Sequence, residues 1–474
     1  MLGALVLGGV GPALAALPPA SASPTAAVEV PSIVVLREGA SAAAVADAAD
    51  VDPTSTYQRA IDGFAADLTS AEILRLRRNP LVKRIVPDET GRVVQPAQVG
   101  PPTKAKSGLV AADPTAPGGL AGTVAAVQAA VQELLVSLGL AAPAPPPQVT
   151  PTAVQRVGAV SSPTARIDSI DERVDATIAL VDTGIERHPD LNLVGGVDCV
   201  DGGSGGYDVD AYRNGTDHAV GHGTLVAGVA AAVDDTSGVV GVAPGARLLS
   251  AKAVDADGAS STGALLCALD WAMQPEQHTD VINISLGWYD GRFGASSAPC
   301  GTDEVDPIHE AICGAVEQGF TVVVAAGNDG RDAAGRVGEY PAHYPAAYPE
   351  VFTVSMIVDF DGLPGGQAAS APACGQSQLD DHLRTTSNFG APVDMAAVGL
   401  CVLTTGLAGS LVTTGGTSLA APAVSGGVAL LRAAAAHVLT PAQARARLLA
   451  DAEPGPIPGD PDDYPEGVLR VAGF

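Results

Sequence analysis

An aspartate, a histidine and a serine stand in surroundings that favour nucleophilic catalysis. Asp182 follows the apolar run "TIALV", His222 lies between two glycines in "AVGHGTLVAGVAAA", and Ser418 precedes a run of small residues in "GGTSLAAPAVSG". A serine hydroxyl is a weak nucleophile until a base such as histidine accepts its proton, and a carboxylate can orient that base. Together the three residues have the types that a Ser-His-Asp triad requires.

Each of these residues also has a structural explanation when it is considered alone. A serine at a helix start can be an N-cap, an aspartate after a strand can be a turn residue, and a histidine beside glycine can be a surface residue. Around Ser418, however, Gly415 and Gly416 leave room for a substrate backbone. A helix N-terminus there would also offer N–H groups and a partial positive charge to an oxyanion.

The elements that would position these residues form an α/β pattern. From about residue 148, apolar strands such as "ATIALVD", "DVINISLG" and "FTVVVAAGN" alternate with helix-like segments. This alternation predicts a doubly wound parallel sheet. Ligands of such sheets bind beyond the carboxyl ends of the strands, which is where Asp182 lies.

A smaller unit precedes this sheet. Residues 28–92 are typical of a strand, a helix, a strand, a second helix starting at Ser70 and a last strand, which predicts a ferredoxin-like α+β domain. Residues 93–147 are rich in Ala and Pro and are typical of a linker. One helix in the linker either docks on a neighbour or is solvated, because apolar residues recur at helical spacing at Val124, Val127, Val131, Leu134 and Leu138.

Length, composition and charge narrow the class of protein. A chain of 474 residues with 47% hydrophobic residues suits two globular domains. Its net charge is −27, and nearly all of it follows Gln148, which argues against a nucleic-acid binder and favours a soluble monomer. Residues 1–22 are similar to a secretory signal peptide, although no Lys or Arg precedes the apolar run. No later run of about 20 apolar residues predicts a membrane anchor, so we expect an extracellular protein.

The six cysteines all follow residue 198, and no C-x-x-C pair occurs. An even number of cysteines in a chain that resembles an exported one favours disulfides, for which fifteen connectivities exist. Proximity in sequence favours Cys300–Cys313 and Cys374–Cys401, which leaves Cys199–Cys267.

The stretches "VDTGIERHPDL", "GHGTLVAGVAA" and "GGTSLAAPAVSG" resemble those of subtilases, the subtilisin-type serine proteases, over about residues 148–450. Leu225 and Leu419 replace residues that are more often His and Met in that family. The resemblance implies a serine endopeptidase with a catalytic domain at 148–474, in which Ser418 is the nucleophile, His222 the base and Asp182 the group that orients it.

The resemblance also implies an oxyanion site and a substrate site. Asn328 in "VVVAAGNDG" would donate to the oxyanion together with the Ser418 backbone N–H, the alternative being an ordinary turn residue. The peptide edge would be Ser285, Leu286 and Gly287, and one wall of the P1 pocket would be Ala325, Ala326 and Gly327. These small residues predict broad specificity with apolar P1 side chains, while the acidic surface would favour basic residues near the cleavage site.

A calcium site follows from the same resemblance. The stretch "AAVDDTSGVVGVAP" is similar to the calcium loop of the family, and hard oxygen donors in such a loop suit Ca²⁺. The alternative is a polar surface turn. The ligands would be the side chains of Gln148, Asp190 and Asp235 and the carbonyls of Val233, Ser237 and Val239.

Residues 28–92 resemble the inhibitory propeptide of subtilases, which implies an intramolecular inhibitor that is cut between about residues 88 and 147. Basic residues near its end, including Lys83 and Arg84, would complement the acidic catalytic domain.

Two other classes of protein remain as alternatives. An inactive scaffold would lack a triad or oxyanion residue, yet all four are present. An esterase on an α/β-hydrolase fold would show G-x-S-x-G and the order Ser, Asp, His, and neither is found around Ser418.

Overall fold

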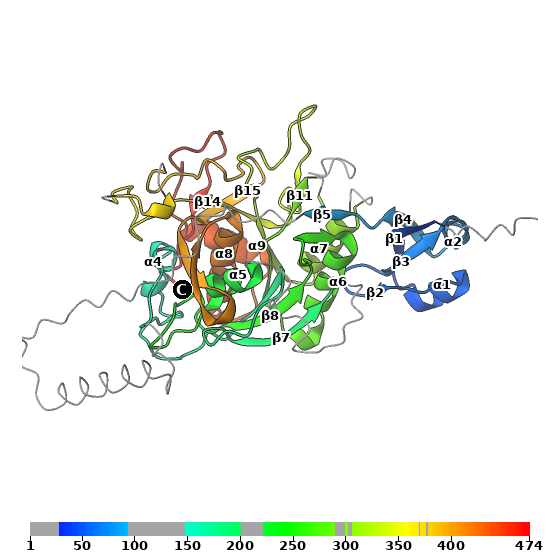
Figure 1. The fold of residues 1–474 in the computed structure, drawn as a ribbon, viewed down its shortest axis with the longest axis horizontal. Coiled ribbons are helices and arrows are strands. Elements are labelled where there is room, and N and C mark those ends of the chain that lie inside the picture. The colour runs from blue at the N-terminus through cyan, green and yellow to red at the C-terminus, as the bar shows by residue number, and fades with distance from the viewer. Residues whose placement is uncertain are drawn as a thin grey trace, which may run out of the picture.

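The computed structural model describes residues 28–92, 147–200, 221–289, 299–301, 306–368, 370–375 and 378–474. A small N-terminal body lies beside a much larger one (Figure 1). The predicted signal segment 1–22, residues 93–146 of the predicted linker and the helix expected within it lie outside the described residues.

The small body is a four-stranded antiparallel sheet with two helices, and its strand order β2-β3-β1-β4 is that of a ferredoxin-like domain. The helix predicted from Ser70 begins there, but its N-cap is Thr69, which forms a capping box with Glu72. The elements are β1 (Glu29–Leu36), α1 (Ala42–Ala49), β2 (Ser55–Tyr57), β3 (Gly63–Thr69), α2 (Ser70–Leu76) and β4 (Val82–Pro87).

The stretch "YQRAIDGFAADLT" is typical of a strand with a glycine-marked turn, and the structure has strand β3 there, which begins at Gly63. The short strand β2 before it is not among the predicted elements. Strand β2 ends at Tyr57 and β3 begins at Gly63, so a loop of residues 58–62 separates them. The backbone N–H groups of Gln58, Arg59 and Ala60 point at the larger body instead of a neighbouring strand. The loop between β2 and β3 therefore contacts the larger body.

The large body is built on an eight-stranded sheet in the order β18-β15-β14-β12-β10-β6-β8-β7, in which every pairing is parallel. This confirms the predicted doubly wound sheet preceded by a small α+β domain. The strands are β6 (Thr177–Asp182), β7 (Leu193–Asp198), β8 (Arg247–Lys252), β10 (Val281–Ile284), β12 (Thr321–Ala325), β14 (Phe352–Ile357), β15 (Val393–Val398) and β18 (Gly467–Val468).

Helices cover both faces of this sheet (Figure 1), so that two cores form. Within β6, Ile178 and Leu180 pack into one core, whereas Ala179 and Val181 pack into the other, as the alternation of a strand requires. The first core includes α4 (Thr152–Arg156), α5 (His222–Ala231), α8 (Thr417–Ala434) and α9 (Pro441–Asp451), and the second includes α6 (Thr262–Ala272) and α7 (Pro307–Glu317).

Short elements complete the large body and join it to the small one. Three two-stranded pairs are antiparallel: β5 (Thr90–Arg92) with β9 (Ala259–Ser261), β11 (Trp288–Tyr289) with β13 (His343–Tyr344), and β16 (Val402–Thr405) with β17 (Leu411–Thr414). Single 3-10 turns lie at Ala159–Ser161, Pro275–Gln277, Ala373–Gly375 and Leu407–Gly409.

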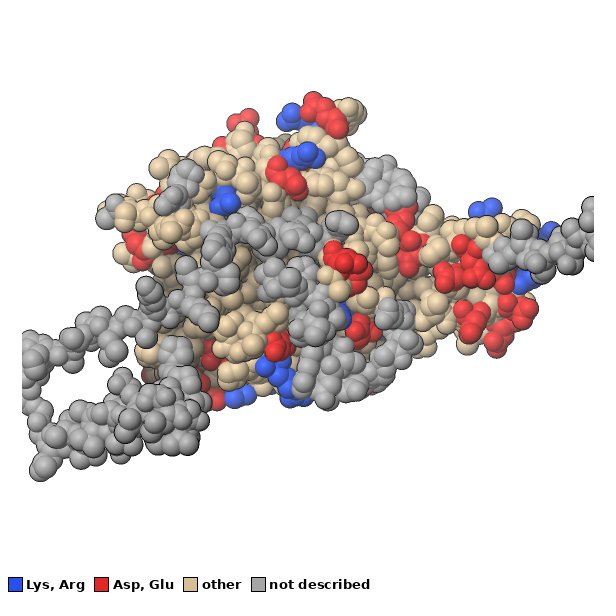
Figure 2. All heavy atoms as spheres, in the orientation of Figure 1, with Lys and Arg blue, Asp and Glu red and all other residues tan. Residues whose placement is uncertain are grey.

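The small body docks on α6 and α7 (Figure 1). The Asp88 carboxylate accepts the Gly263 N–H at the start of α6 over 2.8 Å. Lys83 and Arg84 both form ion pairs with Glu310 of α7, which is the charge complementarity expected from the sequence. Acidic side chains are visible on both bodies in Figure 2.

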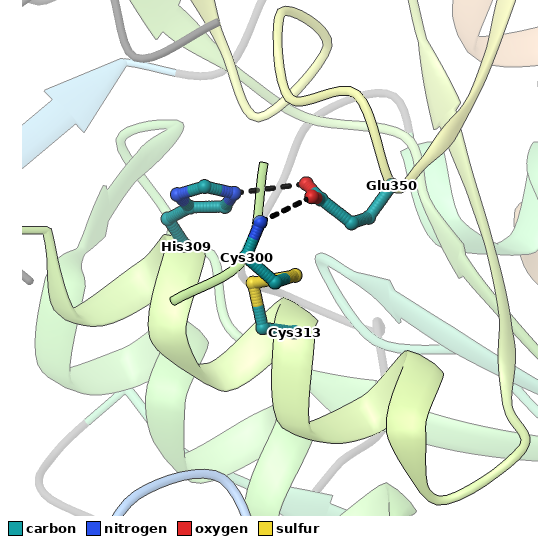
Figure 3. A group of neighbouring side chains, drawn as sticks. All are labelled: Cys300, His309, Cys313 and Glu350. Atoms are coloured by element: carbon teal, nitrogen blue, oxygen red, sulfur yellow. Dashed lines mark hydrogen bonds and ion pairs between the residues drawn. A yellow bond between two sulfur atoms is a disulfide. The ribbon is translucent and has the colours of Figure 1, made fainter. Parts of the chain in front are cut away.

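Three disulfides connect the six cysteines in the predicted pairing: Cys199–Cys267, Cys300–Cys313 and Cys374–Cys401. Beside the second, Glu350 accepts a hydrogen bond from the Cys300 N–H at 2.8 Å and lies 2.8 Å from Nε2 of His309 (Figure 3). Four potential metal ligands meet at this point, but the two sulfurs bond to each other.

Over the described part of the chain, we find no helix with the length and apolarity needed to span a membrane.

Candidate active site

The carboxylate and the imidazole of the predicted triad are hydrogen-bonded. Asp182 is the last residue of β6 and His222 is the first of α5, and Nδ1 of His222 donates to Oδ1 of Asp182 over 2.7 Å. The backbone around them keeps this geometry: Gly223 N–H donates to the Thr183 hydroxyl at 2.9 Å, and a Cβ on Gly223 would stand 2.1 Å from the Gly184 carbonyl oxygen. Only glycine lets α5 start this close to the end of β6.

The serine lies at the start of α8, which packs on α5. The N-cap of α8 is Gly416, so Ser418 is the second helical residue and the N-cap explanation for it is wrong. The two helices touch closely, because a Cβ on Gly426 would stand 3.0 Å from the Ala230 carbonyl oxygen of α5. The Ser285 hydroxyl donates to the Ser418 carbonyl at 3.0 Å and ties the helix start to the end of β10.

Asn328 follows β12 and is held by the residue before the serine. Its Oδ1 accepts from the Thr417 backbone N–H at 2.8 Å and from the Thr417 hydroxyl at 3.1 Å. The left-handed backbone of this loop belongs to Gly327, with φ of 108°, so a left-handed turn does not explain why the next residue is asparagine. Its Nδ2 group remains as a donor beside the start of α8.

Four buried polar atoms of these residues have no hydrogen-bond partner among the residues that the structure describes: Oδ2 of Asp182, Nε2 of His222, Nδ2 of Asn328 and Oγ of Ser418. An unpaired buried donor or acceptor costs free energy, so such atoms are rare in folded proteins. The set contains a base, a hydroxyl and an amide donor, which are the groups that acyl transfer uses.

Sequence reasoning missed Asn388, which holds the loop that carries Asn328. The Asn388 Nδ2 donates to the Ala326 carbonyl at 2.8 Å and to the Tyr289 hydroxyl at 3.0 Å, while its Oδ1 accepts the N–H groups of Asp329 and Arg331, each at 3.1 Å. This side chain is fully buried and uses both of its polar groups. No local motif marks it, because its partners are about 60 or more residues earlier in the chain.

The predicted substrate segments lie at the ends of two neighbouring parallel strands. Residues 285–287 follow β10, and residues 325–327 begin at the last residue of β12. The Ser285 side chain faces the core, because its hydroxyl also accepts from Asn283 Nδ2 at 2.8 Å. Only the backbone of Ser285 is therefore available to a peptide.

A further edge, not predicted from the sequence, is strand β9. It is already paired with β5, with Arg92 opposite Ala259 and Thr90 opposite Ser261. On its other side β5 approaches β11, since a Cβ on Gly91 would lie 2.7 Å from the Trp288 ring. A three-residue strand thus lies between β9 and the segment that follows Gly287.

The residues predicted to bind calcium lie together. Gln148 binds the loop through both ends of its amide, to the Asp234 carboxylate and to the Asp235 N–H at 2.6 Å. The Asp190 carboxylate accepts the Val239 N–H at 2.9 Å, and burial raises the pKa of Asp190 to about 6. Gly238 has φ of 72°, and a Cβ there would overlap the Asp190 carboxylate, so this loop requires glycine. The arrangement gathers oxygen donors around a buried carboxylate, which fits a hard cation.

Comparison with known families agrees with this geometry. The sequence model of the subtilase family matches residues 174–474, and that of peptidase inhibitor I9 matches residues 25–93. The chain belongs to the subtilase family. It is thus a subtilisin-like serine protease with an I9 propeptide domain at its N-terminus.

Curated relatives are similar mainly over the large body. Subtilisin Savinase of Lederbergia lenta is 33% identical over 255 residues, which cover 54% of this chain and 75% of that protein. Subtilisin DY of Bacillus licheniformis is 31% identical over 295 residues, or 62% of this chain and 88% of that protein. An alkaline protease of Shouchella clausii is 33% identical over 255 residues, and the match spans about half of its length, 53%.

Proposed function

We propose that this subtilase is a secreted, self-processing endopeptidase in which Ser418 attacks the scissile carbonyl. His222 accepts the serine proton at Nε2 and returns it to the leaving amine, and Asp182 orients the imidazole and stabilises its cation. The observation that carries this proposal is the 2.7 Å bond between Asp182 and His222, together with the unpaired Nε2 of His222 and Oγ of Ser418.

The oxyanion would be stabilised by Asn328 Nδ2 and the Ser418 backbone N–H. Support comes from the two hydrogen bonds that fix Asn328 Oδ1 on Thr417, because they leave the amide donor rigid and free of a competing partner among the described residues. Donors that are already oriented need little reorganisation during the reaction. The N-terminus of α8 adds a favourable field.

Protein and peptide chains would bind as an added strand, and the I9 domain would act as an intramolecular inhibitor. The pairing of β5 with β9 supports both statements, since an extended segment of this same chain already occupies that edge. The small residues of 285–287 and 325–327 suit broad specificity. Extracellular action is supported by the disulfides and by the likeness to the minor extracellular protease Epr of Bacillus subtilis, 30% identical over 255 residues and covering 32% of that protein.

Ca²⁺ would be held by Gln148, Asp190, Asp235 and the carbonyls of Val233, Ser237 and Val239. It would contribute to stability without taking part in the chemistry, because the loop lies at the far end of α5 from His222. A bound cation would neutralise the buried Asp190 carboxylate.

The test compares the intact mass of the secreted wild type with that of Ser418→Ala, produced identically. We expect the wild type to lose its N-terminal part and Ser418→Ala to keep it, with the new N-terminus marking the maturation site. Ser425→Ala, which removes another buried hydroxyl of α8, is the control and should be processed. Casein and a short-chain ester, each with and without a serine-reactive inhibitor, then separate a protease from an esterase. Processing of Ser418→Ala together with unchanged casein cleavage would refute the assignment.

A further inference from the structure

A buried histidine lies against both backbone segments proposed to form the P1 site. His343, in the short strand β13, is 1% exposed. A Cβ on Gly287 would stand 2.7 Å from Cε1 of this imidazole, and a Cβ on Gly327 would stand 3.0 Å from the same atom. The imidazole therefore fills the side-chain face of both glycines, at the place where the two segments converge.

The ring has hydrogen-bonding capacity that the fold does not use. Neither Nδ1 nor Nε2 of His343 makes a well-oriented hydrogen bond to the described residues. The ring has only a weaker interaction with the backbone of Ala326. Burial lowers the pKa of His343 to about 4. At neutral pH the ring is uncharged, with one nitrogen able to donate a hydrogen bond and the other able to accept one.

The negative charge that acts on the imidazole is that of Asp329. The Tyr289 ring is tilted against His343 at 4.9 Å, and its hydroxyl donates to the Asp329 carboxylate at 3.0 Å. The Arg331 guanidinium lies over the Tyr289 ring, 5.5 Å from its centre. Burial lowers the pKa of His343, and the negative charge of Asp329 partly opposes this effect. The same charge would repel an acidic P1 side chain.

We propose that His343 is a specificity-determining residue, and that it selects uncharged P1 side chains with a hydrogen-bonding group, such as glutamine, over apolar side chains of the same size. The inference rests on the proposed function and replaces the apolar P1 preference expected from the wall residues alone. A P1 amide would give the ring the well-oriented hydrogen bond that the described residues do not supply, whereas an apolar side chain would not. Sites of this kind discriminate strongly against a substrate that lacks the hydrogen-bonding group.

The experiment measures kcat/KM for two peptides that differ only at P1, one with Gln and one with Met. For the processed wild type we expect a Gln/Met ratio of about ten or more. His343→Phe keeps a ring against Tyr289 but has no nitrogen, and its ratio should fall to about one or below. His343→Asn, which restores a hydrogen-bonding group, should recover part of the preference. His437→Phe, at an exposed histidine, is the matched control and should keep the wild-type ratio.

The ratio does not depend on the fraction of folded enzyme, so lower yields of a variant do not affect the result. A wild-type ratio near or below one, or an equal ratio in wild type and His343→Phe, overturns the role of His343. If the processed wild type cleaves neither peptide nor casein, the proposed function fails instead. The two failures are therefore distinguishable.

Discussion

Asp270 of α6 should determine how tightly the I9 domain stays on the catalytic body. One of its carboxylate oxygens accepts the backbone N–H groups of Gln58, Arg59 and Ala60 at 2.7, 2.5 and 2.9 Å. The side chain is buried in the contact, and these three N–H groups belong to the loop that separates β2 from β3. In Asp270→Ala they lose a shared, charged acceptor.

The expected magnitude follows from these contacts. A hydrogen bond to a charged group contributes about 1.5–3 kcal/mol, and three bonds that share one oxygen contribute less than three times that value. We therefore expect a loss of about 3–4 kcal/mol, which raises the dissociation constant of the cleaved I9 domain by about 10²–10³. Asp270→Asn keeps an acceptor without the charge and should fall between Asp270→Ala and the wild type.

The assay follows co-elution of the cleaved N-terminal fragment with the catalytic body during gel filtration, over a dilution series of self-processed protein in the presence of a serine-reactive inhibitor. The control Glu276→Ala removes an exposed acid near the end of α6 and should behave as wild type. The protein concentration at which the fragment dissociates is compared between the two proteins. If this concentration for Asp270→Ala lies within about threefold of that for the wild type, these contacts do not hold the I9 domain, and the reasoning is refuted.

Three other perturbations follow from the structure. Asn328→Ala should lower kcat by about 10²–10³-fold with little change in KM. Asn328→Asp, which keeps the acceptor for Thr417, should be similarly impaired. A loss of kcat below tenfold, measured with titrated active sites, would contradict the oxyanion role. A chelator should lower Tm in the wild type but not in Asp190→Ala, as thermal unfolding with and without Ca²⁺ would show; an unchanged wild-type Tm would argue against the cation. Burial, assisted by Asp460, raises the pKa of Glu466 to about 7, so the folded state holds this proton at pH values where the unfolded state has lost it. The stability of wild type relative to Glu466→Gln should therefore fall as pH rises from about 4.5 to 7, and chemical denaturation curves with a constant difference would contradict this.

The predictable features of the fold were those that local sequence carries. Each residue of the proposed triad stands at an element end within a distinctive stretch, and the apolar runs that make β6, β10 and β12 are buried on both faces, as a parallel sheet requires. The predicted disulfide pairs also follow from proximity for two of the three bridges.

The features that were not predictable depend on contacts between distant residues. Nothing near Asn388 indicates that its amide would brace the loop after β12, and nothing near His343 indicates that its ring would meet Gly287 and Gly327. The loop between β2 and β3 likewise depends on Asp270, about 210 residues later, as its partner. These roles are set by packing, which local propensity does not encode.

The placement of the disulfides affects how the two bodies separate. All six cysteines are paired within the catalytic body, so the I9 domain has no covalent bond to it except the backbone that follows Arg92. While that backbone is intact, the I9 domain faces its site at a high effective concentration, which the linker sets and dilution does not change. The proposed hydrolysis of one peptide bond would turn the contact into an ordinary bimolecular equilibrium. From then on, the volume into which a secreted protein is diluted would decide how much of the site is free.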